Sequence, residues 1–259
     1  MRLILPMAGA GERFFDDGYD LPKPLIDVGG IPMFMRVIEN LGDNWDDITC
    51  IVNSDHVRNY NIDERILAYN PDIRIVVTDG LTEGAACTVM LAIDENADTP
   101  LMIANCDQIM LWDKPGFDEA VKTWDVVYEN HGGVIMTFTP DHNEPKHSYI
   151  SLGKYGTTMD CLQEKNNMFT NGPDGNPYMS DLATTGVYYF SSEKDFHKAA
   201  TEMIGLNDRT NNEFYLAPIY NYIDGWITHY PVDKMIGMGT PEELKATLHE
   251  HSDFNNWAV

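Results

Sequence analysis

Short apolar runs that alternate with helix-like segments constrain this chain more than any other feature. Runs suited to buried strands occupy residues 2–7, 48–53, 73–79, 100–107, 132–139 and 184–190. Helix-like segments lie between or after them, at residues 32–42, 85–96, 116–124, 192–204 and 240–251. Strands and helices that alternate in this way build sheets whose strands run mainly parallel and whose faces are covered by helices. The pattern therefore predicts an α/β fold.

The length and charge of the chain exclude several classes of function. With 259 residues and no low-complexity linker, we expect a single domain over residues 1–259. The formal net charge of −24 at pH 7 repels nucleic acid and anionic membranes. No window approaches 18 apolar residues, and the N-terminus lacks the pattern of a signal peptide, so we expect no membrane span. The four cysteines show no CxxC spacing and are expected to be reduced thiols of a cytoplasmic protein.

The residues after the first apolar run break with this acidic background. The stretch AGAGERF places Gly9 and Gly11 in a turn and Arg13 two residues later. Backbone N–H groups of such a turn can cradle phosphate oxygens, and an arginine adds a bidentate donor. The stretch is not a dinucleotide GxGxxG motif, which needs glycine at Phe14, and it is not a P-loop, which needs Gly-Lys-Ser/Thr. A tight surface turn with an incidental arginine is the alternative interpretation.

The residues that follow this turn favour the phosphate-binding interpretation over the incidental surface turn. The block AGAGERF…PKPLIDVGGIPM resembles the N-terminal signature of the sugar-phosphate nucleotidyltransferases, in which a G-x-G-[ST]-R loop precedes P-K-P-[LM] and a helix start. The resemblance implies a three-layer α/β/α fold of the nucleotide-diphospho-sugar transferase (GT-A-like) type with a mainly parallel mixed sheet. It also implies that Arg13 neutralises the phosphates that leave as pyrophosphate, while Lys23 stabilises charge on the α-phosphate. One departure is Glu12, which stands where the family has a small hydroxyl residue.

Weaker motifs follow in the order that the family has them. TEGAACTVMLA (82–92) resembles the family's base-contacting G-T-A-x-A segment, LQEKNN (162–167) its E-K segment, and ATTGVYYF (183–190) the strand beside the acceptor. Within roughly residues 1–110, the resemblance implies a nucleotide-binding set of Met7, Ala8, Gly9, Ala10, Gly11, Glu12, Arg13, Lys23, Gly84, Ala85 and Asn105. Within roughly residues 111–259, it implies an acceptor-binding set of Glu164, Lys165, Thr185 and Gly186. We also expect Lys146 and His147 to lie at the rim of the acceptor pocket.

Asp107 is the candidate metal ligand. It follows the run LMIAN at the end of a predicted buried strand, where open α/β sheets place ligands, and a carboxylate there suits Mg²⁺. It resembles the family's metal aspartate, which implies Mg²⁺ or Mn²⁺ as the cofactor. The family's second metal aspartate lies in W-x-D-x-G-T-P, and this chain has Gly237 at that position. Asp233, four residues earlier, is the candidate second ligand; water and phosphate oxygens are the alternative.

Three further segments carry structural expectations. Residues 164–181 are rich in Asn, Gly and Pro and predict one long loop on the substrate side. Residues 211–223 predict an amphipathic helix, which resembles the family's E-x-Y-[LV]-x-[DP] helix. In TPEEL, Thr240 is the expected N-cap, Pro241 is the first helical residue, and Glu243 completes a capping box with Thr240.

The resemblance extends from residue 2 to about residue 246. It implies an enzyme that moves an NMP group from an NTP to a phosphorylated acceptor, most often a sugar 1-phosphate, and releases pyrophosphate. The partners are then the NTP and the phosphorylated small molecule, with a homo-oligomer left open. One alternative is a cytidylyltransferase that acts on a small non-sugar phosphate or phosphonate. A glycosyltransferase of related fold is another, although NCDQ has one acid where a D-x-D motif has two, and a non-catalytic nucleotide-binding relative is a third.

Overall fold

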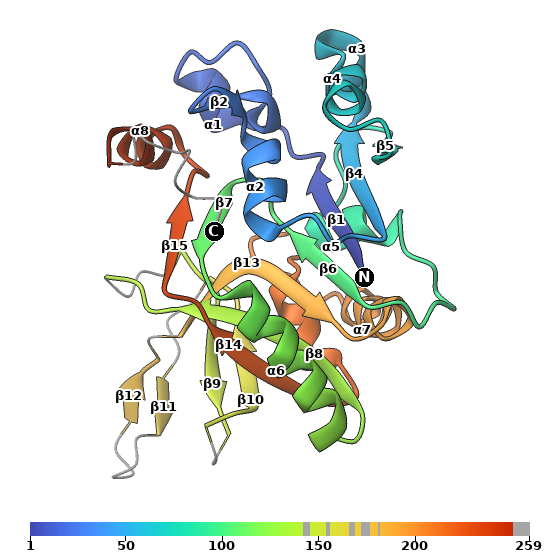
Figure 1. Cartoon of the computed structure of the whole chain (residues 1–259), viewed down its shortest axis with the longest axis vertical. Helices are drawn as coiled ribbons and strands as arrows, with labels where there is room; N and C mark the ends of the chain where they lie inside the picture. Colours follow the sequence, from blue (N-terminus) through green and yellow to red (C-terminus); the bar gives the residue numbers. More distant parts are fainter. Residues whose placement is uncertain (142–145, 154–155, 166–168, 172–176, 181, 251–259) are drawn as a thin grey trace.

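The computed structural model describes residues 1–141, 146–153, 156–165, 169–171, 177–180 and 182–250. Its main sheet has nine strands and runs in the order β10-β9-β13-β6-β1-β4-β5, with β8 beside β13 and β14 beside β8 (Figure 1). The first half of the chain supplies the parallel strands β1 (Arg2–Met7), β4 (Asp47–Asn53), β5 (Arg74–Thr78) and β6 (Leu101–Ala104). The carboxyl ends of these strands therefore meet at one edge of the sheet.

The second half of the chain joins this sheet through a single long strand. This strand, β13 (Ala183–Phe190), is antiparallel to β6 on one side and to β8 (His131–Phe138) on the other. β8 pairs in parallel with β14 (Trp226–Pro231), and β9 (Tyr149–Leu152) pairs with β10 (Met159–Gln163) and with the start of β13. The sheet is therefore mixed, with its parallel block in the N-terminal half.

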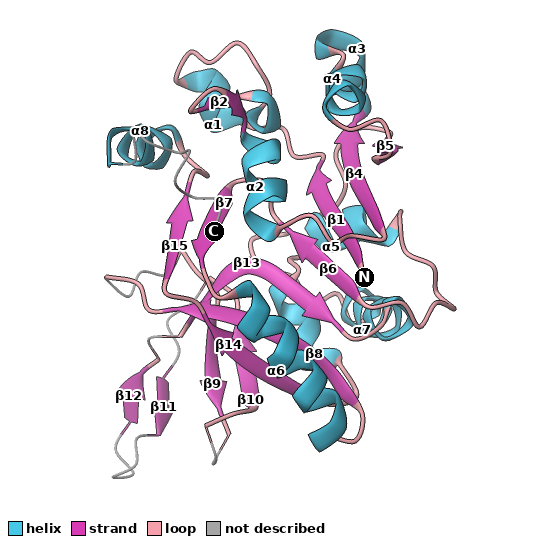
Figure 2. Ribbon diagram, in the orientation of Figure 1, coloured by secondary structure: helices cyan, strands magenta, loops and turns pink. Residues whose placement is uncertain are grey.

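Helices cover both faces of the sheet, as the alternation of side chains along β1 requires. Leu3 and Leu5 pack into one hydrophobic core with α2 (Met33–Leu41) and α6 (Lys114–Val127). Ile4 points to the opposite core, with α5 (Ala85–Met90) and α7 (Glu193–Gly205). Figure 2 shows α2 and α6 in front of the sheet. The α/β class and the three layers expected from the sequence are thus confirmed.

The remaining elements are short. The helices are α1 (Glu12–Asp16), α3 (Ser54–Tyr60), α4 (Ile62–Tyr69) and α8 (Pro241–Glu250), with 3₁₀ turns η1 (Lys23–Leu25) and η2 (Ala217–Tyr222). Two-stranded ladders join β2 (Asp27–Val28) to β3 (Ile31–Pro32), β7 (Gln108–Leu111) to β15 (Lys234–Gly237), and β11 (Phe169–Asn171) to β12 (Pro177–Met179). Within the described residues, no helix is both long enough and apolar enough to cross a membrane.

Three expectations differ from the structure. The helix expected at 85–96 ends at Met90, and the carbonyl of Ala92 instead accepts hydrogen bonds from Arg2. The helix expected at 211–223 is only the 3₁₀ turn η2, because Asn211 and Asn212 adopt left-handed backbone angles that a right-handed helix excludes. The loop expected at 164–181 contains the β11–β12 hairpin, while its residues 166–168, 172–176 and 181 lie outside the described residues.

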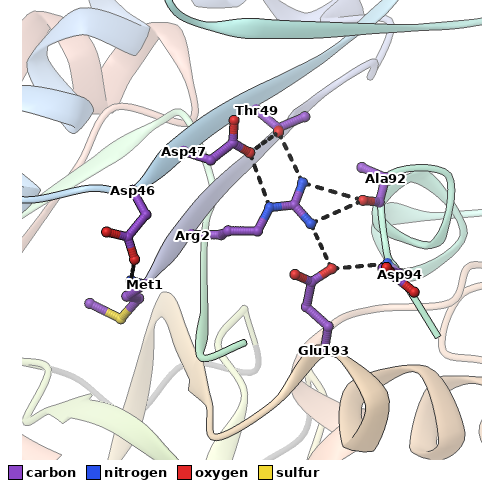
Figure 3. Close-up of polar contacts among 8 residues, drawn as sticks. All are labelled: Met1, Arg2, Asp46, Asp47, Thr49, Ala92, Asp94 and Glu193. Carbon is purple, nitrogen blue, oxygen red and sulfur yellow. Dashed lines mark hydrogen bonds and ion pairs between the residues drawn. The ribbon is translucent and has the colours of Figure 1, made fainter. Parts of the chain in front are cut away.

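A polar cluster at the amino end of β1 ties distant segments together (Figure 3). The guanidinium of Arg2 donates to Asp47 on β4 at 3.0 Å and to Glu193 on α7 at 2.6 Å. Glu193 is 1% exposed and also accepts from the backbone N–H of Asp94 at 2.9 Å. Because the buried carboxylate needs a partner, Arg2 fixes α7 against the end of the sheet opposite to the parallel carboxyl ends.

Candidate active site

A cavity of about 360 Å³ opens beyond the carboxyl ends of β1 and β6. The first half of the chain lines it with Arg13, Lys23, Ala85, Asn105, Asp107 and Gln108. The second half contributes Lys146, His147, Ser148, Glu164, Lys165, Thr184, Thr185, Gly186, Tyr188, Tyr215, Leu216, Met235, Gly237, Gly239, Thr240 and Glu243. The cavity therefore lies between the two halves, at the edge of the sheet where open α/β proteins place ligands.

The segment that follows β1, through α1 to η1, brings two cationic side chains to the cavity, those of Arg13 and Lys23. Gly11 has a left-handed φ of 70° and allows the chain to turn from β1 into α1. A Cβ atom at Gly11 would lie 3.6 Å from both Cβ and the backbone nitrogen of Lys23, so the start of α1 packs against η1. Phe14 anchors α1 in the core, and the adjacent Arg13 lines the cavity.

Lys23 forms an ion pair across the floor of the cavity. Its Nζ lies 2.8 Å from Oδ2 of Asp107, and both side chains are largely buried. Desolvation alone would lower the pKa of Lys23, but the attraction of Asp107 and their hydrogen bond outweigh it and raise that pKa overall. Lys23 therefore keeps its positive charge. Burial also raises the pKa of the neighbouring Cys106 thiol to about 11, so this thiol is neutral at pH 7 and is not an activated nucleophile.

The second half of the chain brings another acid and another cation to the cavity, Glu164 and Lys165, directly after β10. Glu164 accepts a hydrogen bond from the hydroxyl of Ser148. Burial raises the pKa of Glu164, against the opposing effects of Ser148 and Lys165. Lys165 has a left-handed φ of 47°; its Nζ donates to the hydroxyl of Tyr215 and lies 4.2 Å from the centroid of that ring. The ammonium is thus held at the cavity by a cation–π contact.

Two side-chain amides converge where β13 passes the cavity. Gly186 has a left-handed φ of 81°, and a Cβ atom there would lie 2.2 Å from Nε2 of Gln108 and 2.8 Å from Nδ2 of Asn105. Only glycine leaves room for both amides. Gln108 is 8% exposed, and its Nε2 has no hydrogen-bond partner among the described residues. Because an unpaired buried donor is costly, this amide is suited to an oxygen atom of a ligand.

The start of α5 closes the end of the cavity near Ala85. Gly84 precedes this helix with a φ of 135°, and a Cβ atom there would lie 2.4 Å from the carbonyl oxygen of Phe214. The same carbonyl accepts from the backbone N–H of Ala86 at 3.0 Å, and Phe214 N–H donates to the carbonyl of Glu83 at 2.9 Å. The backbone at Gly84 is therefore fixed by residues of the second half of the chain.

The second carboxylate beside Asp107 comes from α8. Glu243 lines the cavity, its Oε2 accepts from the backbone N–H of Gly239 at 3.1 Å, and its Oε1 lies 3.6 Å from Nζ of Lys146. Asp233 lies elsewhere, because β15 runs antiparallel to β7 and places Gly237 beside Gln108 but Lys234 beside Leu111. The structure therefore does not bring Asp233 to Asp107. Among the described residues, no group of three or more His, Cys, Asp or Glu side chains is placed to hold a metal ion.

The expected site residues fall into three groups. The structure gathers most of them around one cavity, which is lined by Arg13, Lys23, Ala85, Asn105, Asp107, Lys146, His147, Glu164, Lys165, Thr185 and Gly186. The others, apart from Asp233, lie at the end of β1, in the loop that leads to Arg13, or at the start of α5, namely Met7, Ala8, Gly9, Ala10, Gly11, Glu12 and Gly84. The sequence prediction missed Gln108 and the cavity-facing role of Glu243. The position of Gln108 directly after Asp107 was the available signal.

Comparison with solved structures supports this architecture. A nucleoside-diphosphate-sugar pyrophosphorylase from Vibrio cholerae RC9 is 21% identical with a TM-score of 0.74, over 95% of this chain and 99% of that one. A putative glucose-1-phosphate thymidylyltransferase from Bacillus anthracis is 18% identical with a TM-score of 0.73, over 98% and 99%. The inositol-1-phosphate CTP transferase from T. maritima is 13% identical with a TM-score of 0.68, over 100% and 97%. At these identities the likeness shows the fold.

The family follows from the sequence itself. No curated protein sequence matches the chain. A family model described as nucleotidyl transferase matches residues 2–214, which include the cavity residues Arg13, Lys23, Asp107 and Lys165 but not the lining residues from Tyr215 to Glu243. The chain belongs to the nucleotidyl transferase family.

Proposed function

We propose that this protein transfers a nucleotidyl group from an NTP to a phosphorylated small molecule, a sugar 1-phosphate, and releases pyrophosphate. The observation that carries the proposal is one cavity that is lined by cations from both halves of the chain. Arg13 and Lys23 come from the first half of the chain, and Lys165 comes from the second half. Two phosphorylated substrates that must react with each other need such an arrangement, because each brings negative charge into a strongly acidic protein.

The chemistry needs positioning and charge neutralisation. An oxygen of the acceptor phosphate attacks the α-phosphorus of the NTP in line; the new P–O bond forms as the bond to pyrophosphate breaks. Arg13 stabilises the leaving pyrophosphate, Lys23 stabilises charge on the α-phosphate, and Lys165 orients the acceptor phosphate. No covalent enzyme intermediate is required, which agrees with the neutral state of Cys106. Glu164, Thr185 and Gly186 belong to the acceptor side of this proposal.

A divalent cation fits the donor set of the cavity. Asp107 presents a carboxylate at its floor, and the hard cation Mg²⁺ is commonly bound by one or two carboxylates together with substrate phosphates. We assign Asp107 to hold Mg²⁺ or Mn²⁺, which when bound would neutralise phosphate charge. The ammonium groups of Lys23 and Lys165 and the guanidinium group of Arg13 would neutralise the rest of the phosphate charge.

Pyrophosphate release tests the proposal directly. Each of the four common NTPs is combined with Mg²⁺ and a panel of sugar 1-phosphates, small phosphorylated alcohols and phosphonates. We expect release that depends on one NTP and on a sugar 1-phosphate. Release only with a non-sugar phosphate or phosphonate would make the protein a transferase with another acceptor. NTP binding without release across the panel would contradict the proposed transfer reaction.

Two variants test the roles of the cations. Arg13→Ala and Lys23→Ala are each expected to lower kcat about 10²–10³-fold, because each removes a donor to charge that develops in the transition state. Arg58→Ala is the matched control, since it removes an arginine whose side chain is 64% exposed and which does not line the cavity. If both cavity variants kept the turnover of the control, the roles assigned to Arg13 and Lys23 would be wrong.

A further inference from the structure

Resting on the proposed function, we infer that Glu243 of α8 supplies the second metal-binding carboxylate, in place of the aspartate that the family carries at the position of Gly237. This residue comes from a different element, one turn into the helix that follows. Glu243 would then bind the metal ion in addition to capping α8, and Asp233 would not bind it.

The space around Gly237 is the first observation. A Cβ atom at Gly237 would lie 3.3 Å from Oε2, 3.4 Å from Cδ and 3.7 Å from Oε1 of Glu243. The carboxylate of Glu243 therefore fills the space into which a side chain at position 237 would extend. A glutamate that reaches in from α8 and an aspartate at position 237 would compete for the same place.

The second observation is the position of this carboxylate relative to Asp107. A Cβ atom at Gly239 would lie 3.0 Å from Oδ2 of Asp107 and 3.4 Å from Oε2 of Glu243. The two carboxylates thus flank one glycine, and a side chain at Gly239 would intrude between them. The backbone N–H of Met238 also donates to the carbonyl of Asp107 at 2.7 Å, which fixes this loop against the end of β6.

The cap of α8 explains how Glu243 is held. Its backbone N–H donates to Oγ1 of Thr240 at 3.2 Å, as the predicted capping box requires. In a capping box the glutamate side chain returns to the N–H of the N-cap residue, whereas here Oε2 accepts from the N–H one residue earlier, at Gly239. The carboxylate therefore extends beyond the helix start to the cavity, which it lines.

An unpartnered group next to this pair points to a ligand. Gly237 lies opposite Gln108 in the β15–β7 ladder, and the buried Nε2 of Gln108 has no hydrogen-bond partner among the described residues. A ligand oxygen in the same cavity would satisfy it. Each carboxylate also holds an ammonium group, Asp107 that of Lys23 at 2.8 Å and Glu243 that of Lys146 at 3.6 Å. A metal ion that binds both carboxylates would therefore share or displace these ammonium groups.

Mn²⁺ binding to the protein without nucleotide tests the inference, measured by electron paramagnetic resonance and calorimetry. Glu243→Gln keeps an acceptor for the N–H of Gly239 and removes the charge, so the cap survives while the carboxylate ligand becomes a neutral, weaker amide ligand. We expect it to weaken Mn²⁺ binding at least tenfold, since even changes outside the ligand shell cost about 10–100-fold. Glu242→Gln, which removes the same charge from the adjacent exposed residue of α8, is expected to change binding less than twofold.

A relocation variant gives the test a second arm. Gly237→Asp combined with Glu243→Ala returns the carboxylate to position 237 and vacates the space that the glutamate fills. We expect this double variant to bind Mn²⁺ within several-fold of the parent protein, while Glu243→Ala alone binds weakly. The fraction of folded protein is followed by circular dichroism in each case.

The outcomes separate this inference from the proposed reaction. If Asp107→Asn weakens Mn²⁺ binding while Glu243→Gln behaves like Glu242→Gln, the inference is overturned, and the proposed reaction still depends on pyrophosphate release. If Glu243→Gln loses Mn²⁺ and the double variant regains it, the inference holds even if no acceptor supports pyrophosphate release. If the parent protein binds no Mn²⁺, the inference is overturned as well.

Discussion

Gly9→Ala should change stability and nucleotide binding in opposite directions. No heavy atom lies within 4 Å of the place that a Cβ atom would take, and the φ of Gly9 is outside the left-handed region. The added methyl group therefore meets nothing in the folded state, and it restricts the unfolded chain. We expect a gain of about 0.4–1 kcal/mol in the free energy of unfolding. At roughly 2–4 °C per kcal/mol, the melting temperature would rise by about 1–4 °C.

The loss in binding follows from the proposed role of the loop after β1. If its backbone N–H groups contact phosphate, the methyl group keeps the phosphate away, and losing one hydrogen bond to a charged group costs about 1.5–3 kcal/mol. The dissociation constant for the preferred NTP should then rise about ten- to a hundredfold. Calorimetric titration measures this constant, and differential scanning calorimetry measures the melting temperature.

Gly205→Ala is the matched control for Gly9→Ala. Gly205 is exposed at the end of α7, its φ is also outside the left-handed region, and no heavy atom lies within 4 Å of its Cβ position. It should stabilise the protein without changing the affinity for NTP. If Gly9→Ala leaves the affinity equal to that of this control, the loop after β1 does not contact the phosphates.

Three further predictions concern the framework of the site. Gly84→Ala should lower the free energy of unfolding by about 3–5 kcal/mol, because backbone atoms of Phe214 block the new methyl group. Gly80→Ala is the control, since Gly80 has a left-handed φ but open space around its Cβ position. It should lower the free energy of unfolding by only about 1–2 kcal/mol, and urea denaturation measures both losses. Arg2→Met should lower the free energy of unfolding by about 3–5 kcal/mol, because it leaves Glu193 buried without its cation. Arg58→Met breaks an exposed ion pair, and urea denaturation should show that it lowers the free energy of unfolding by less than about 1 kcal/mol. The raised pKa of Glu164 means that the folded protein holds this proton more tightly than the unfolded chain does. The contribution of Glu164 to stability should therefore fall as pH rises above about 4.3, the ordinary pKa of a glutamate, so Glu164→Gln should gain stability relative to the parent protein as pH rises above this value; a pH-independent difference would contradict the shift.

The parallel half of the fold was predictable because local and tertiary preferences agree there. The runs at 2–7 and 48–53 are apolar on both faces, as strands buried between two helical layers must be, and they correspond to β1 and β4 almost residue for residue. The 3₁₀ turn η2 was not predictable in the same way. Its segment has a helical apolar pattern, but two left-handed asparagines precede it, and tertiary packing sets that backbone.

The site was predictable where residues adjacent in sequence act together. There are three such cases: the glycine turn with Arg13, the pair Glu164 and Lys165, and Asp107 after its strand. The structure places Arg13, Asp107, Glu164 and Lys165 at one cavity. Glu243 is different. Its sequence context is a helix start, and only the antiparallel pairing of β15 with β7 brings that helix to Asp107. No local pattern encodes this approach.

The central place of β1 in the sheet has a consequence for synthesis on the ribosome. β1 is made before the other strands of the main sheet, yet one of its two neighbours, β6, begins only at Leu101, and β6 in turn needs β13, which begins at Ala183. A nascent chain that ends before residue 101 can pair β1 with β4 and β4 with β5, but it leaves the inner edge of β1 open. Such an edge is a template for wrong pairing with other chains. Conditions that slow elongation before residue 101, or before β13 emerges, should therefore favour aggregation of this protein, because its contacts span most of the chain.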